Sequence, residues 1–135
     1  MADSFEEFKT GLQRFNNEAE KEATKQLRRI SLKALSMIVM STPVLTGCCR
    51  ANWVVSVGSL SRKYDSKKKD KSGGKAINAG MTRISSAQLG TDVLIENSCP
   101  YVMRLENGWS RQTPPGGMIR NNLAKLRKAV ANGAR

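Results

Sequence analysis

Apolar residues follow a helical period through the first third of the chain. They recur in steps of three or four residues at Phe5, Phe8, Leu12, Phe15, Ala19, Ala23, Leu27, Ile30, Ala34, Met37 and Ile38. This spacing predicts one amphipathic helix over residues 4–41, roughly 55 Å long, with Ser4 and Glu7 spaced as a capping box. The alternative is two shorter helices that break near Gly11 or at Asn16-Asn17. Because a 135-residue domain offers too small a core for that length, part of the apolar stripe should pack against another subunit.

Two stretches after the long helix have the composition of β-strands. Residues 42–47 contain a proline and a glycine and predict a turn. Residues 50–58 predict a strand that has an inward face formed by Trp53, Val55 and Val57. Residues 91–97 predict a second strand, on which Asp92 and Glu96 share one face. Their carboxylates would be about 13 Å apart, too far to share a proton, so we expect both to face solvent.

The rest of the chain predicts short helices and one forced turn. Residues 76–89 have the spacing of a short helix, which Gly80 should weaken. Residues 101–106 predict one or two helical turns. The sequence Pro-Pro-Gly-Gly at 114–117 predicts a tight turn, and residues 117–132 predict a C-terminal helix.

The net charge of +12 is concentrated after the long helix. Residues 1–41 hold seven Lys/Arg and six Asp/Glu, a balance of +1, whereas residues 42–135 hold sixteen and five, a balance of +11. A surface this basic favours a polyanion such as nucleic acid. A role in solubility, or pairing with an acidic protein, explains the charge equally well.

Residues 59–75 form the most basic segment and contain few apolar residues. Seven Lys/Arg oppose two Asp, a balance of +5. We predict an exposed, flexible loop that contacts DNA phosphates without reading sequence; the alternative is a solvated linker. The candidate DNA-facing residues are Arg62, Lys63, Lys67, Lys68, Lys69, Lys71 and Lys75.

Catalytic and metal chemistry find little support in the composition. The chain has no histidine, so neither a Ser-His nor a Cys-His dyad can form. Its three cysteines, two of them adjacent at Cys48-Cys49, match neither a disulfide framework nor a metal-binding spacing. We expect no catalytic residue, metal site or cofactor, and we expect Cys48 and Cys99 to be small buried groups. The N-terminus lacks a secretory apolar region, and no window of about 18 apolar residues predicts a membrane span.

Two motifs resemble one known family. The first is Thr42-Pro-Val-x-Thr-Gly-x-x-Arg-Ala-x-Trp53, and the second is Asn97-x-x-Pro-Tyr-x-x-Arg-Leu-Glu-x-Gly-Trp-Ser-x-Gln-x-Pro114. In this order, with these elements between them, they resemble the tail-completion and minor tail proteins of tailed bacteriophages, the minor tail protein Z family among them. The likeness spans nearly the whole chain. Leu45 departs from it, because the family usually has Asp there, and so does Cys48-Cys49, which stands where the family has Arg-Leu.

The resemblance implies a fold, a place and a set of partners. The fold would be a single α+β domain in which the long helix packs on a small, mainly antiparallel sheet, with a short middle helix and a C-terminal helix. The protein would form a ring of six copies at the neck of the virion, assembled in the host cytoplasm, with DNA passing through its lumen. Its partners would be the tail terminator or tube protein and the head connector. The alternative is a free, non-specific nucleic-acid-binding protein that uses the basic loop and the C-terminal helix.

A closed ring needs a heterologous interface with two different complementary surfaces on each subunit. The long helix and residues 101–118 are the candidates. We expect the subunit or partner contacts to include Trp109, Arg104, Glu106, Arg111, Tyr101 and Arg50. Trp53 should lie in the core. For Tyr101, a core position with its hydroxyl hydrogen-bonded is favoured, and a subunit contact is the other interpretation of this residue. Arg104 and Glu106 are too close in sequence to face each other, so each should pair elsewhere.

Overall fold

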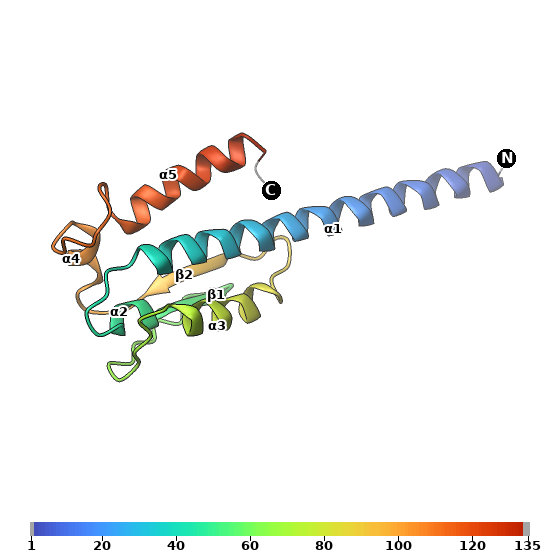
Figure 1. Cartoon of the computed structure of the whole chain (residues 1–135). Coiled ribbons are helices and arrows are strands. Elements are labelled where there is room, and N and C mark those ends of the chain that lie inside the picture. Colours follow the sequence, from blue (N-terminus) through green and yellow to red (C-terminus); the bar gives the residue numbers. More distant parts are fainter. Residues whose placement is uncertain (1, 134–135) are drawn as a thin grey trace.

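The structure, a computed structural model, describes residues 2–133. Its elements, in chain order, are α1 (Ala2–Ser41), α2 (Cys48–Ala51), β1 (Trp53–Val57), α3 (Gly74–Ile84), β2 (Val93–Asn97), α4 (Val102–Glu106) and α5 (Met118–Ala131). The predicted α+β fold is confirmed, with a long N-terminal helix, an antiparallel sheet and a C-terminal helix. The N-terminal half of α1 projects away from the body formed by the other elements (Figure 1).

Helix α1 is continuous over 40 residues. It passes through Gly11 and Asn16-Asn17, so the alternative of two shorter helices is wrong. The capping box is also wrong, because α1 begins at Ala2 and Ser4 therefore lies inside the helix. A single glycine costs about 1 kcal/mol in a helix, too little to interrupt so long a run.

The sheet contains two antiparallel strands, in register from Trp53 opposite Asn97 to Val57 opposite Val93. β1 starts later than predicted, because residues 48–51 form α2 after Gly47, which has a left-handed backbone (φ 86°). Trp53 and Val55 are buried, as expected for the inward face. They share the core with apolar residues of α1 and α3 and with the start of α5, namely Leu35, Ile38, Val39, Ala76, Ile84 and Met118.

Helix α3 packs closely because Gly80 has no side chain. A Cβ at Gly80 would collide with Cδ2 of Leu35 and would lie 2.8 Å from Cγ2 of Val55. The glycine that weakens the helical pattern in the sequence therefore allows α3 to approach both α1 and β1. Across residues 2–133, no helix combines the length and the apolar character needed to cross a membrane.

Candidate functional site

Three residues of the first motif meet at the C-terminal end of α1. Nε1 of Trp53 donates to Oγ1 of Thr42 at 2.7 Å, and that hydroxyl donates to the carbonyl of Ile38 at 2.8 Å. Nη2 of Arg50 donates to the carbonyl of Thr42 at 2.7 Å. Thr42 is almost fully buried, so the end of α1 is fixed to β1 by a satisfied polar network.

Arg50 extends this network to the basic loop. Its guanidinium also donates to the carbonyl of Met40 at 3.1 Å and to that of Lys71 at 2.7 Å. The side chain therefore holds three backbone carbonyls from two segments of its own chain. The sequence predicted Arg50 as a subunit contact, but the structure gives it an internal role, because its donors are directed at these carbonyls.

The two motifs contact each other. The side-chain amide of Gln112 accepts from the N–H of Val44 at 2.8 Å and donates to the carbonyl of Val44 at 3.0 Å. Nδ2 of Asn97 donates to the carbonyl of Cys49 at 2.8 Å, and its Oδ1 accepts from the N–H of Cys99 at 2.9 Å. Segments that are far apart in sequence therefore form one hydrogen-bonded unit, called here the joint (residues 42–53 and 97–117).

Glu106 connects the joint to α5. Only 6% of its surface is exposed, and its carboxylate accepts from the N–H groups of Ile119 at 2.9 Å and Arg120 at 3.2 Å. Nε of Arg120 lies 3.5 Å from the same carboxylate. A negative group at this position satisfies the free N–H groups of the first turn and interacts favourably with the helix dipole. Glu106 was predicted as a subunit contact; instead it is buried and caps α5.

The outer surface of the joint carries exposed aromatic and basic residues. Trp109 is 73% exposed, and the guanidinium carbon of Arg104 lies 5.2 Å from the centroid of its ring, within range of a cation–π interaction. Arg111 is exposed. Tyr101 is 37% exposed, so it is reachable from outside and does not lie in the core formed by Trp53 and Val55. Trp109, Arg104, Arg111 and Tyr101 are all placed where a partner could reach them.

The three cysteines are buried free thiols. Burial, together with the neighbouring Cys99, raises the pKa of Cys49 to about 12. A thiol with so high a pKa is a poor nucleophile at neutral pH. Cys48 and Cys99 are small buried groups, as expected. Among the described residues, no cluster of three or more His, Cys, Asp or Glu side chains is placed to hold a metal ion.

The basic loop between β1 and α3 is exposed, as expected, but its backbone is anchored to the body. The side chain of Asn52 accepts from the N–H of Asp65 at 2.9 Å and donates to its carbonyl at 3.0 Å. Asp70 is buried and accepts from the N–H groups of Gly73 and Ala76, both at 3.1 Å, at the start of α3. Burial alone would raise the pKa of Asp70, but these hydrogen bonds lower it below the ordinary value.

Glu96 holds the beginning of the same loop. Its carboxylate accepts from the hydroxyls of Ser56 and Ser61 at 2.7 and 2.6 Å and from the N–H of Ser61 at 2.7 Å. Burial alone would raise the pKa of Glu96, but these hydrogen bonds lower it to about 2. The prediction that Glu96 faces solvent is therefore wrong, because the loop folds over it.

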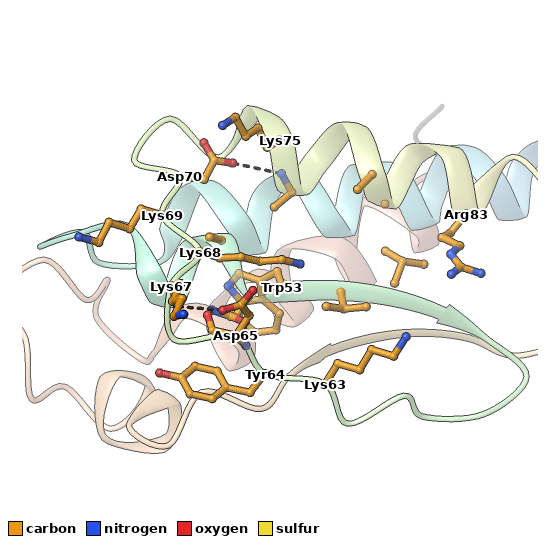
Figure 2. A pocket seen from close by; sticks show the side chains of 17 residues that line it. Trp53, Lys63, Tyr64, Asp65, Lys67, Lys68, Lys69, Asp70, Lys75 and Arg83 are labelled. Carbon is orange, nitrogen blue, oxygen red and sulfur yellow. Dashed lines mark hydrogen bonds between the residues drawn. The ribbon is translucent and has the colours of Figure 1, made fainter.

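A groove of about 1020 Å³ lies between the basic loop, β1 and α3. Its floor includes Trp53 and Val55, and its rim is basic (Figure 2). Six basic and two acidic side chains line it, which gives a net charge of +4. They are Lys63, Lys67, Lys68, Lys69, Lys75 and Arg83, with Asp65 and Asp70. This surface is called the basic groove.

The basic groove contains only part of the predicted DNA-facing set. Lys75 lies on α3 rather than in the loop. Arg62 and Lys71 are outside the lining, whereas Arg83, which the sequence did not single out, belongs to it. Arg83 could not be found from the charge run, because α3 brings it to the groove from outside that segment.

The second prominent surface is the projecting part of α1, residues 3–23, called the arm. All of its residues are exposed, and at 1.5 Å per residue it is about 30 Å long. Phe5, Phe8, Leu12 and Phe15 are 67%, 68%, 50% and 69% exposed. Contiguous exposed apolar residues on this scale mark interaction sites, and burying each such side chain contributes about 1.5–3 kcal/mol.

Comparison of the chain with protein-family models, with curated proteins and with solved structures finds no match. The function of the joint, the basic groove and the arm is therefore inferred from their residues and geometry.

Proposed function

We propose that this chain is a structural, non-enzymatic protein of a tailed-phage virion. It forms a ring of six copies at the neck, completes the tail and joins it to the head. Its partners are the tail terminator or tube protein on one side and the head connector on the other. The protein assembles in the host cytoplasm and needs neither a metal nor a cofactor.

The observation that carries this proposal is the exposed apolar stripe of the arm. Three phenylalanines and a leucine lie in water along one face of a helix, an arrangement that becomes favourable when another chain covers it. A ring in which every subunit covers its neighbour meets this requirement without free ends. A monomeric enzyme or a free DNA-binding domain gives no reason for the stripe.

The joint supports the same function. The residues that carry the resemblance to tail-completion proteins do not surround a ligand pocket; they bond to one another, as Arg50 with Thr42 and Gln112 with Val44 do. The result is a rigid unit that presents Trp109 on its surface. Rigid exposed aromatic residues of this kind are frequent anchors at protein interfaces.

The charge distribution fits a ring through which DNA passes. Residues 42–135 carry +11, and many of the lysines extend from the surface of an anchored loop. Contacts of lysine with phosphate are weak, independent of sequence and sensitive to salt. Such contacts allow a duplex to slide, which a site for a specific sequence would prevent.

A deletion of the gene in its phage tests this proposal. We expect the titre of infectious particles to fall to background and to be restored by the wild-type chain supplied from a plasmid. Supplying Trp109→Ala should restore it only in part, whereas Lys125→Ala, an exposed change on α5, should restore it fully. Infectious particles with normally joined heads and tails in the deletion strain would contradict the proposal.

The basic groove favours one second candidate, a free nucleic-acid-binding protein. In that case the isolated chain binds DNA with micromolar or tighter affinity and a salt slope of several units. Reversing Lys67, Lys68 and Lys69 to Glu should abolish this binding. It should also preserve the fold, because the anchors of the loop are Asn52, Asp70 and Glu96. The neck function predicts weak binding instead.

A further inference from the structure

We propose that the arm of one copy of this chain lies in the basic groove of a second copy. The inference deepens the proposed function and rests on its claim that the chain forms a ring, because it names the two surfaces that meet between neighbouring subunits. In this arrangement the basic groove, rather than residues 101–118, receives α1 of the neighbouring subunit. Trp109 is then free to contact another protein of the virion.

The two surfaces carry opposite charge. Residues 3–23 contain six acidic side chains, Asp3, Glu6, Glu7, Glu18, Glu20 and Glu22. They contain three basic ones, Lys9, Arg14 and Lys21, so the balance is −3. The basic groove has a balance of +4. The arm is therefore the most acidic stretch of a chain that is otherwise strongly basic, and complementary charge favours and orients the encounter of two such surfaces.

The apolar groups also match. Phe5, Phe8, Leu12 and Phe15 follow the spacing by which an amphipathic helix inserts one face into a groove. The floor of the groove offers apolar surface from β1 and α3, including Val54 and Ala79. With about 100° per residue, Glu18 and Glu20 fall on opposite sides of the stripe. They can thus reach the two sides of the rim, where Figure 2 shows Lys63 on the loop and Arg83 on α3.

The arm that lies in the basic groove has to come from a second copy of the chain. Helix α1 is continuous from the arm to its packed half, and the arm leads away from the body (Figure 1). It therefore does not fold back into its own groove. An arm in the groove of the next copy is a heterologous contact, which closes into a ring when the rotation per subunit allows it.

Pairing of two arms with each other is less well supported by the sequence. If Phe5 takes position a of a heptad, Glu22 falls at a d position, where an apolar residue is needed. The e positions hold Lys9, Asn16 and Ala23, and the g positions after Phe5 hold Gly11 and Glu18. In a parallel pair of arms, Gly11 would then face Asn16 and Glu18 would face Ala23, so no pair of opposite charges forms there. The basic groove has a balance of +4, whereas a second arm has one of −3 and would repel the first.

Charge reversal in the full-length chain tests the contact. The arm variant carries Glu18→Lys, Glu20→Lys and Glu22→Lys, and the groove variant carries Lys63→Glu, Lys68→Glu and Arg83→Glu. A matched control carries Lys125→Glu, Arg127→Glu and Lys128→Glu on the exposed face of α5. All of these side chains are exposed, and circular dichroism checks that each variant is folded.

Sedimentation velocity then measures self-association. We expect the arm variant and the groove variant each to raise the dissociation constant at least about tenfold, and the control to match the wild type. An equimolar mixture of the two variants should restore assembly, because each reversed surface then finds a reversed partner. The double substitution Phe8→Ala and Phe15→Ala should weaken assembly without any change in charge.

Three results would overturn the inference. One is a wild-type chain that stays monomeric at its highest soluble concentration. Another is a mixture that fails to restore assembly. The third is a groove variant that assembles like the wild type but no longer binds DNA, which would assign the groove to nucleic acid. The joining of heads and tails in the phage is measured separately. If virions are joined normally although the arm and the basic groove do not bind each other, this inference is wrong and the neck function stands. If the arm and the groove bind but the virions do not depend on the chain, the neck function is wrong.

Discussion

The cap of α5 by Glu106 yields a quantitative prediction about the joint. Replacing Glu106 with Ala removes the acceptor of two backbone N–H groups, those of Ile119 and Arg120. Hydrogen bonds to a charged acceptor contribute about 1.5–3 kcal/mol each, and loss of a helix cap costs about 0.5–2 kcal/mol in total. Because the first turn of α5 is only partly buried, water replaces some of this loss. We expect a decrease in the free energy of unfolding of about 3 kcal/mol, or roughly 10 °C in Tm.

Two further substitutions separate the cap from the ion pair. Arg120→Ala removes a side chain that is 63% exposed, and exposed ion pairs contribute about 0–1 kcal/mol. Glu106→Gln keeps one acceptor oxygen but turns an amide donor toward the second N–H. It should therefore lower the free energy of unfolding by less than Glu106→Ala and by more than Arg120→Ala. Urea unfolding followed by circular dichroism measures all three, and the slope m should not change. If Glu106→Ala and Arg120→Ala destabilise the protein equally, the interpretation of Glu106 as a cap is wrong.

Three other predictions concern individual side chains. The pKa of Glu96 is lowered to about 2 from an ordinary 4.5, so the stability it contributes is complete above pH 4.5 and is lost as the pH falls toward 2. Glu96→Gln should therefore lower the free energy of unfolding by about 2 kcal/mol at pH 7. It should also make that free energy, measured by urea unfolding, depend less on pH between 4.5 and 2; an unchanged pH dependence would contradict this. Cys49, with a pKa of about 12, should react with a thiol reagent at pH 8 at least about a hundredfold more slowly than after unfolding in urea, and equal rates would refute its burial. Trp109→Ala should leave Tm within about 2 °C of the wild type, since the side chain is exposed, while it removes the acrylamide-accessible part of the tryptophan fluorescence. Retention of that component would mean that Trp53 is exposed instead.

The secondary structure was predictable where a long period exists. The apolar repeat from Phe5 to Ile38 specified α1, and β-branched residues around Val55 specified β1. Helix α2 was missed because its four residues are shorter than any period and run directly into a strand pattern. The predicted N-cap at Ser4 was wrong, because the capping-box spacing of Ser4 and Glu7 does not prevent the helix from starting earlier in the chain.

The roles of charged residues were much less predictable. Glu96, Glu106 and Arg50 all appear in the sequence as surface charges. Their partners include backbone groups 8 to 35 residues away, such as the N–H of Ser61 for Glu96 and the carbonyl of Thr42 for Arg50. No periodic pattern in the sequence predicts these partners, because the conformations of the loops bring them within hydrogen-bonding distance of the charged side chains. The basic groove was hidden for the same reason, since it forms only when α3 lies beside the loop.

We propose above that this chain joins head and tail as a neck protein of a tailed phage. The decisive experiment is negative-stain electron microscopy of particles from a phage strain that lacks the gene for this chain. We expect separate filled heads and separate tails in the deletion strain, and joined virions when the wild-type chain is supplied. Normally joined virions in the deletion strain would contradict it.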